Sequence, residues 1–340
     1  MTREPSVAAL LWISLCALYV GLGVLGLVDG LWGVAPYIAA VTIARVAEPR
    51  PELRRALRTV VLAAATAAIV VGIAVGLGRR HVFGSAPTDT VKLVTVAAWS
   101  LAAVGASTLA CAIRPLRERL FRRLALDARS AVHATSAALY AATLVVMVGS
   151  FVLLYDDPGE AIPIYLSDPA VSLLTDVPLA LAGVGFLMTR NLSTAMNRLG
   201  FMPITRRQVA WSGVVAAAFV VVAGVLDHAE AWLLPEIYGR EGRFSLTFAN
   251  VSPWVGAPLV AMAAGVGEEA VFRGALQPRF GVLLTALLFA SVHVQYEIPG
   301  VLLIFLIGVV LGVLRDRTST TFTALAHMLY DIAAFLLPDV

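Results

Sequence analysis

The chain of 340 residues is strongly apolar, with 59% hydrophobic residues, 14% charged residues and a mean hydropathy of +0.86. Soluble domains usually carry about 25% charged residues, so this composition excludes a water-soluble globular fold for much of the chain. The net charge of +3 excludes nothing by itself. Both cysteines, Cys16 and Cys111, lie in apolar runs, which argues against a disulfide framework or a cysteine metal site.

Apolar runs close to the ~20 residues of a membrane-spanning helix recur along the whole chain. We therefore predict an all-α polytopic membrane protein with about eleven transmembrane helices, located in a cell membrane and expected in a bacterial inner membrane. The run at 31–46 is short and also compatible with a re-entrant or interfacial helix. The predicted helices cover residues 5–29, 31–46, 57–78, 91–113, 131–155, 169–189, 208–227, 252–276, 281–296, 299–314 and 319–337.

Arginine-rich loops set the predicted orientation. Segments 45–58, 114–129 and 190–207 are rich in arginine, whereas segment 156–168 holds four acidic residues and no basic one. Because cytoplasmic loops carry an excess of Lys and Arg, we place the first three inside and the fourth outside. This arrangement gives a cytoplasmic N-terminus and an outer C-terminus. The arginine pair at 79–80 falls on the opposite side and counts against it.

One acidic residue interrupts an apolar run before residue 205. Asp176 lies in the stretch LLTDVPLAL, two residues before Pro178. Aspartate commonly caps helix ends, and proline commonly lies near them. We therefore interpret Asp176 as a local helix cap.

Most ionisable residues that interrupt apolar runs occur after residue 265. Such groups are costly in lipid, so each one requires a partner or a function. They lie in the stretches GVGEEAVFRG, LLFASVHVQ and ALAHMLYDIAA. The candidates are Glu268, Glu269, Arg273, His293, His327 and Asp331.

Each of these candidates has an ordinary structural interpretation when it is taken alone. Glu269 and Arg273 are spaced i,i+4, so one helix face can hold them as an ion pair. His327 and Asp331 have the same spacing, and the aspartate can satisfy the imidazole. A single histidine such as His293 is more often a hydrogen-bonded core residue than a catalyst.

Taken together, the candidates favour one shared site. Residues 277–281, Gln-Pro-Arg-Phe-Gly, predict a tight turn between two antiparallel helices. At about 1.5 Å per residue, Glu268, His293 and His327 lie roughly 15–21 Å from the arginines at the ends of their helices. At this similar depth the groups face one another or a water-filled cavity rather than lipid. A carboxylate and an imidazole around a water form a general-base site.

The motifs around these residues resemble those of the CAAX prenyl-protease and bacteriocin-processing family of intramembrane proteases (CPBP, also called Abi). The family motifs E-E-x-x-x-R, F-x-x-x-H and H-x-x-x-N or H-x-x-x-D lie on successive membrane helices. This chain has EEAVFR at 268–273, FASVH at 289–293 and HMLYD at 327–331. Three motifs in this order within apolar runs are specific, and the resemblance covers residues 205–340.

The resemblance implies a glutamate-dependent peptidase that requires no metal and no other cofactor. By this similarity, Glu268 is the base that activates water, and His293 helps to hold that water. His327, together with the residue at 331, would stabilise the oxyanion of the tetrahedral intermediate.

Other motif residues need separate comment. Glu269 and Arg273 would support the site by the same similarity. Asp331 stands where the eukaryotic prenyl-proteases have asparagine. Because an ionised aspartate cannot donate a hydrogen bond to an oxyanion, Asp331 either orients His327 or stays protonated in a low-dielectric site.

The resemblance also suggests a division of the chain and a class of partner. We predict an N-terminal membrane region of unassigned role, residues 1–204, and a protease core, residues 205–340. The expected partners are the lipid bilayer and a membrane-anchored protein or peptide that is cut near its terminus. Nothing in the sequence indicates nucleic acid, and nothing shows whether the substrate is prenylated.

Three alternative functions stay open. A zinc-dependent membrane protease has matching ligand types, although the sequence lacks an H-E-x-x-H pair. A membrane scaffold or bacteriocin-immunity factor would keep the fold without proteolysis. A transporter would use the buried groups as a proton relay, but it should show repeated halves or paired broken helices.

The arginine distribution predicts that position 120 is cytoplasmic. In a chain whose native cysteines are replaced, Leu120→Cys should resist a membrane-impermeant thiol reagent in intact cells and react in inverted vesicles. Leu166→Cys, in the predicted outer loop, is the matched control and should react in intact cells. Labelling of position 120 from outside would show that the orientation is inverted.

Overall fold

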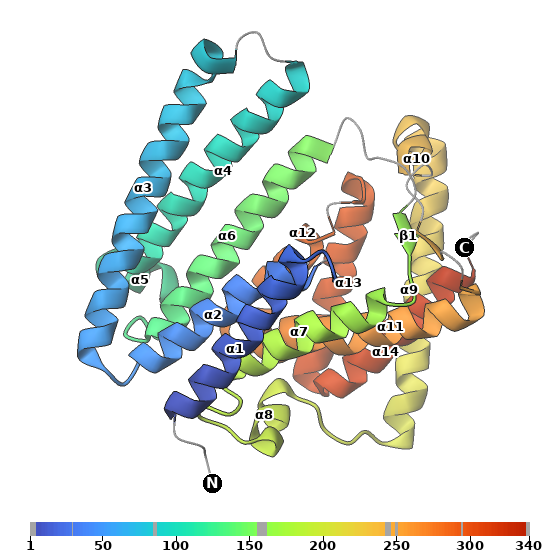
Figure 1. The fold of residues 1–340 in the computed structure, drawn as a ribbon. Coiled ribbons are helices and arrows are strands. Elements are labelled where there is room, and N and C mark those ends of the chain that lie inside the picture. The colour runs from blue at the N-terminus through green and yellow to red at the C-terminus, as the bar shows by residue number, and fades with distance from the viewer. Residues whose placement is uncertain are drawn as a thin grey trace. The chain divides into compact units, whose positions relative to one another are not determined.

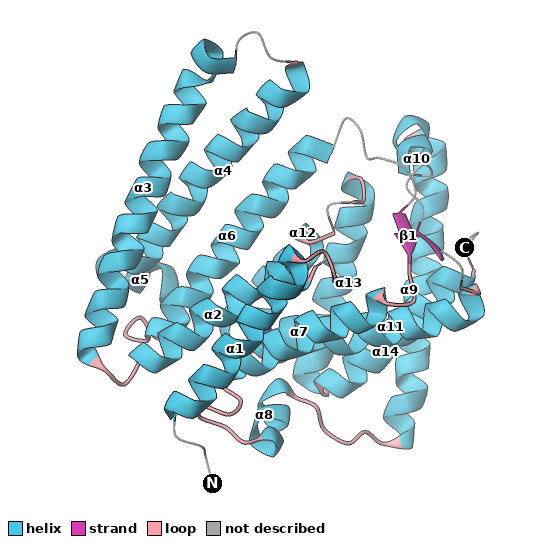
Figure 2. Ribbon diagram, viewed as in Figure 1, coloured by secondary structure: helices cyan, strands magenta, loops and turns pink. Residues whose placement is uncertain are grey.

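The computed structural model describes residues 5–28, 30–83, 87–154, 162–241, 246–248, 251–293 and 295–337. Helices make up most of this described chain, and the only sheet within it has two short strands (Figure 2). The structure therefore confirms the predicted all-α membrane fold. The first part of the predicted acidic outer loop, residues 156–161, lies outside the described residues.

The chain divides into two compact units. The first comprises Met1–Thr42, Gly159–Ala290 and Tyr296–Val340, and the second comprises Ile43–Pro158 and Ser291–Gln295. Two helices, α1 Pro5–Val24 and α2 Leu31–Ala47, begin the chain, and α2 ends within the second unit. The predicted boundary between residues 204 and 205 concerns the extent of the protease core and stays a prediction.

The second unit is a set of long helices. It contains α3 Pro51–Phe83, α4 Thr88–Ala112, α5 Arg114–Phe121 and α6 Ala131–Leu154. Helix α4 packs against both α3 and α6 (Figure 1). Glycines allow this close approach, because a Cβ on Gly105 would lie 2.7 Å from the Ala65 carbonyl oxygen of α3.

The first unit carries the motif-bearing helices. Its strands, β1 Ile162–Ile164 and β2 Leu246–Phe248, pair in parallel. Its further helices are α7 Asp168–Val184, α8 Leu192–Leu199, α9 Arg206–Leu233, α10 Pro235–Glu241, α11 Pro253–Glu269, the π-helix η1 Ala270–Leu276, α12 Gln277–Ser291, α13 Ile298–Arg317 and α14 Thr320–Leu336. Helix α11 packs against α7 and α14 (Figure 1).

Seven helical segments of the described chain are long and apolar enough to cross a membrane, fewer than the eleven predicted. Two predicted helices, 252–276 and 281–296, form one of these segments, Pro253–Ser291. Three others, α2, α7 and α14, are real helices of 17 residues each. The difference of four therefore comes from one merged pair and from three helices whose length is at the lower limit for a span.

The predicted turn at residues 277–281 corresponds to a break in the helix. Gly281 has φ 79° and ψ 172°, which lie outside the helical region and are accessible mainly to glycine. The chain therefore changes direction at the predicted place, although Gln277 and Phe280 remain helical.

Several predicted helix ends are wrong. Helix α9 runs to Leu233, so the segment after 227, predicted as a loop, begins as helix. Helix α12 ends at Ser291 rather than at 296, because α13 begins at Ile298 and the chain needs the intervening residues to turn. Helix α7 ends at Val184, where Gly185 adopts a left-handed conformation with φ 84°.

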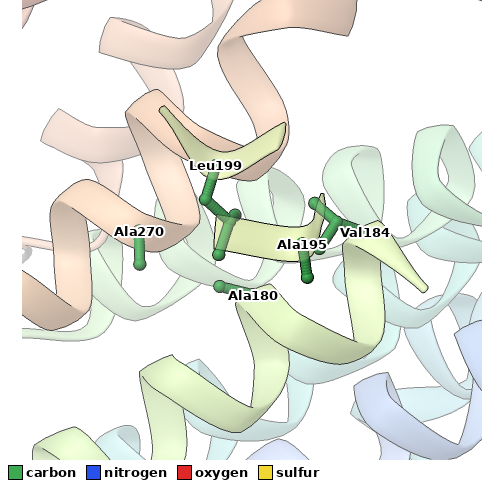
Figure 3. Close-up of a cluster of buried hydrophobic side chains, with 5 residues drawn as sticks. All are labelled: Ala180, Val184, Ala195, Leu199 and Ala270. Atoms are coloured by element: carbon green, nitrogen blue, oxygen red, sulfur yellow. The ribbon is translucent and has the colours of Figure 1, made fainter. Parts of the chain in front are cut away.

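Small residues bring the helices around the motifs into close contact. In α7, α8 and η1 three alanines form a buried cluster with a valine and a leucine (Figure 3). The cluster comprises Ala180, Val184, Ala195, Leu199 and Ala270. On the other side of α11, a Cβ on Gly265 would lie 2.3 Å from Met328 Cγ and 2.8 Å from the Ala324 carbonyl oxygen of α14. The glycine therefore sets the α11–α14 distance close to the motif residues.

Hydrogen bonds to carbonyls at the end of α8 hold the start of α14. The Thr320 hydroxyl donates to the Leu199 carbonyl at 2.6 Å, and the Thr320 amide donates to the Gly200 carbonyl at 3.0 Å. Ser319 caps α14 by accepting from the Phe322 amide at 3.2 Å. These contacts fix the helix that presents the third motif.

We expect Gly265→Ala to destabilise the protein, because overpacking of a close contact costs about 1–3 kcal/mol. Gly213→Ala on α9 is the matched control, since a Cβ there has no neighbour within 4 Å. The control should be neutral or stabilising by up to about 1 kcal/mol, the difference in helix propensity. Melting temperatures in detergent compare the two, and equal melting temperatures would contradict the packing argument.

Candidate active site

Two adjacent glutamates lie where helix α11 changes into a π-helix. Glu268 and Glu269 are the last residues of α11, and η1 begins at Ala270. π-helical segments are rare and often occur at functional sites, because the wider turn redirects the side chains on either side. The change in helix type therefore falls within the EEAVFR motif.

Glu269 and Arg273 form a buried ion pair. Arg273 Nη1 lies 3.1 Å from Glu269 Oε1, and the two side chains are 1% and 0% exposed. The orientation does not make this contact a well-aligned hydrogen bond, so the attraction is mainly Coulombic. The ion pair predicted from the i,i+4 spacing is confirmed.

Arg273 also connects α11 to two further helices. Its Nη2 donates to the Gly308 carbonyl of α13 at 3.4 Å. Its guanidinium carbon lies 4.4 Å from the centre of the Phe289 ring of α12, within the range of a cation–π contact. One buried cation thus contacts α11, α12 and α13.

His327 of α14 lies among three carboxylates. Its Nδ1 is 3.3 Å from Glu269 Oε1, close enough for a hydrogen bond. On the other side of the ring, Nε2 is 3.6 Å from Asp331 Oδ2 and 4.0 Å from Glu268 Oε2. The predicted His327–Asp331 contact is therefore present, and the imidazole bridges both glutamates of α11.

The two glutamates differ in environment. The Glu268 side chain is 24% exposed, whereas that of Glu269 is fully buried. Within the described residues, Glu268 Oε2 is buried but accepts no hydrogen bond. Glu269 Oε2 also accepts no hydrogen bond from the described residues, so the two glutamates differ in exposure and in the contacts of Glu269 Oε1 with Arg273 and His327.

His293 occupies a different position from the one the sequence predicted. It follows the end of α12, which stops at Ser291, and its side chain is half-buried. Residues 291–295 belong to the second unit, so the proximity of His293 to Glu268 stays a prediction. The structure brings together Glu268, Glu269, Arg273, His327 and Asp331.

Asp176 is a residue whose position the sequence interpretation missed. It lies inside α7, which begins at Asp168 after Ser167, so its assignment as a helix cap is wrong. Its Oδ2 would lie 2.9 Å from a Cβ on Gly267, the residue before Glu268. The criterion that selected the other candidates, an ionisable group in an apolar run, also applied to Asp176.

A metal centre is not evident from the side chains that the structure describes. Among these residues, no group of three or more His, Cys, Asp or Glu has an arrangement that could hold a metal ion. Cys16 and Cys111 are buried and form no disulfide.

Comparison with known proteins places all three motifs in one family match. Residues 250–333 match the family described as "Type II CAAX prenyl endopeptidase Rce1-like". The chain is also 27% identical over 128 residues to "Uncharacterized protein YpbD" of Bacillus subtilis (strain 168), covering 36% of this chain and 66% of that protein. No solved structure matches the chain. The family resemblance is therefore confirmed for residues 250–333, and it supports a CAAX-type intramembrane protease.

We expect Glu269→Gln to lower stability, because it leaves Arg273 buried without its charge partner. Breaking a buried pair from one side typically costs about 3–5 kcal/mol. The exposed i,i+4 pair of Arg114 and Glu118, 2.6 Å apart, supplies the control. Glu118→Gln should change stability by less than about 0.5 kcal/mol. Melting temperatures and yields in detergent measure both, and equal losses would contradict the structural importance of the buried pair.

Proposed function

We propose that the protein is an intramembrane endopeptidase in which Glu268 is the general base that activates water. The family match supports the class of enzyme, and the unequal environments of the two glutamates support the choice of base. The Glu268 side chain is 24% exposed, whereas Glu269 is fully buried and paired with Arg273, so Glu268 is the more accessible glutamate and the freer to take a proton. This is the single observation on which the proposal chiefly depends.

In the proposed reaction, water attacks the carbonyl carbon of the scissile peptide bond. Glu268 takes one proton from that water as the new carbon–oxygen bond forms, and the carbonyl oxygen becomes an oxyanion. When the tetrahedral intermediate collapses, the carbon–nitrogen bond breaks and Glu268 returns the proton to the leaving amine. The Glu268 side chain is partly exposed and its Oε2 lies 4.0 Å from His327 Nε2, so a water bound at the exposed part of the carboxylate would lie near the imidazole.

His327 is the proposed donor to the oxyanion. Glu269 contacts Nδ1, and Asp331 lies 3.6 Å from Nε2, so carboxylates hold the imidazole from two sides. An ionised Asp331 cannot itself donate to the oxyanion. We therefore assign Asp331 to the orientation of His327, and Arg273 to the placement of Glu269. His293 would help to hold the water.

The proposed substrate is a membrane-associated protein or peptide, cut near its terminus, in a cell membrane. The buried position of the site in apolar helices supports a substrate that reaches it from the bilayer. A prenyl group on the substrate is not required by this argument. A scaffold or immunity role would use the same fold without turnover, so variants of the two glutamates separate these functions.

We expect Glu268→Gln to abolish proteolysis while the protein still folds. The substitution keeps the size of the side chain but removes the proton acceptor, and loss of a general base typically lowers the rate about 10²–10⁴-fold. The measurement is comparative membrane proteomics of cells that carry either the wild type or Glu268→Gln. A client protein whose terminus is no longer trimmed is the expected result.

Glu269→Gln and the melting temperature provide the controls for this experiment. Glu268→Gln should melt within a few degrees of the wild type, since it breaks no ion pair with Arg273. In a large domain, each kcal/mol of lost stability lowers the melting temperature by about 2–4 °C. If Glu269→Gln stops trimming without loss of stability and Glu268→Gln stays active, the base has been assigned to the wrong glutamate. If no trimmed client distinguishes the two cell lines, the scaffold function is favoured.

A metal-free mechanism predicts that purified enzyme stays active after exhaustive chelation. Glu268 would act on water directly, so removal of divalent ions should leave the cleavage rate unchanged. The rate on the client peptide is measured before and after chelation, and again after zinc is added. Activity that is lost and then restored by zinc specifically would establish the zinc mechanism instead.

A further inference from the structure

The helix α7 brings a carboxylate against the backbone of the active-site helix. Asp176 lies eight residues into α7, and its Oδ2 and Cβ would be 2.9 and 3.0 Å from a Cβ on Gly267. Any larger residue at 267 would collide with the aspartate. The chain therefore combines a glycine on α11 with an aspartate on α7, one residue before Glu268.

The hydrogen bonds of Asp176 do not explain why a carboxylate lies at this position. Ser172 Oγ and Thr175 Oγ1 lie 3.5 and 3.4 Å from its oxygens, and the Thr175 hydroxyl also donates to the Ser172 carbonyl at 2.8 Å. One hydroxyl proton cannot serve both acceptors well. In the described part of the chain, no Lys, Arg or His pairs with Asp176. An uncompensated carboxylate among apolar helices is costly, and a neutral side chain would avoid that cost.

The segment of α7 that carries Asp176 is held in place from α1. Pro178 has no amide hydrogen, so the Leu174 carbonyl one turn earlier lacks its helical donor. The Tyr19 hydroxyl of α1 donates to that carbonyl at 2.5 Å. The aspartate is therefore presented to α11 by a supported helix rather than by a loose one.

The charged groups around Glu268 come from both sides of α11. On the α14 side, His327 lies 4.0 Å away with Asp331 beyond it. Along its own chain, Glu269 and Arg273 form the buried pair. On the α7 side, Asp176 is near enough to Glu268 for the two carboxylates to interact electrostatically. Glu268 thus has a carboxylate on one side and an imidazole on the other.

We propose that Asp176 is a positioning residue that directs the Glu268 carboxylate away from α7 and toward His327. The proposal rests on the assignment of Glu268 as the base. Like charges repel and the imidazole attracts, so the two helices together select one orientation of Glu268. The close approach at Gly267 places the aspartate against the backbone one residue before Glu268. Asp176 lies outside the family match, which covers only residues 250–333.

The first test measures the electrostatic coupling between Asp176 and Glu268 and needs no substrate. Dicyclohexylcarbodiimide modifies protonated carboxyl groups in membranes, and mass spectrometry of the purified full-length protein gives the extent of labelling at Glu268 against pH. In Asp176→Asn the midpoint of this labelling curve should move by about one pH unit or more, as expected when a neighbouring carboxylate loses its charge. Asp168→Asn is the matched control on the same helix, because it makes the same chemical change at an exposed position about 12 Å away.

The electrostatic coupling between Asp176 and Glu268 is reciprocal, so it can also be measured in a variant of Glu268. Glu268→Gln should move the labelling midpoint of Asp176 by the same amount as Asp176→Asn moves that of Glu268. This measurement keeps the proposal testable if Asp176→Asn does not fold. Unmoved midpoints in the folded variants would overturn it.

The second test reads catalysis on the client peptide. Asp176→Asn should lower kcat about tenfold or more with KM and melting temperature unchanged, because a misdirected base affects only the transition state. Asp168→Asn should retain the wild-type kcat. If Glu268→Gln is inactive but Asp176→Asn keeps the wild-type kcat, the positioning role alone is refuted. If Glu268→Gln retains full activity, the proposed function fails, and the inference fails with it.

Discussion

The buried ion pair between Glu269 and Arg273 is the interaction on which the candidate site depends. Neither ion would be tolerated alone among apolar helices, so each requires the other. The arginine also contacts the Gly308 carbonyl and the Phe289 ring, and the glutamate contacts His327. One charge pair thereby fixes α11, α12, α13 and α14 around a common point.

This pair also explains how adjacent, chemically identical residues acquire different environments. Glu269 is fully buried and contacts Arg273 and His327, whereas Glu268 is partly exposed and lies 4.0 Å from His327 Nε2. Successive residues of a helix point about 100° apart, and the π-helix that begins at Ala270 changes the direction of the side chains after the glutamates. Our proposal that Glu269 supports the site and that Glu268 is the general base rests on this difference.

Glycine and alanine supply the close approach that such a polar cluster requires. Association of helices in lipid gains nothing from hiding apolar surface from water, so it depends on tight packing and on polar contacts. Gly265 sets the distance from α11 to α14, and Gly267 sets the distance from α11 to α7. These two glycines lie on the same helix as the paired glutamates, so packing and chemistry are specified within five consecutive residues.

The sequence by itself determined the membrane fold class, the three motifs and the Glu269–Arg273 and His327–Asp331 contacts, because these depend on composition and on spacing along a single helix. The sequence prediction misplaced the ends of α9 and α12 and interpreted Asp176 as a helix cap. The helix ends and the surroundings of Asp176 depend on neighbours that are distant in the chain. The sequence predicted that Glu268 and His327 share one site, but the contact of His327 with Glu269 and the closeness of Asp176 to Gly267 were decided only by the packing of α7 and α14 against α11. Contacts within a helix are set by its periodicity, whereas contacts between helices are set by how closely their backbones can approach.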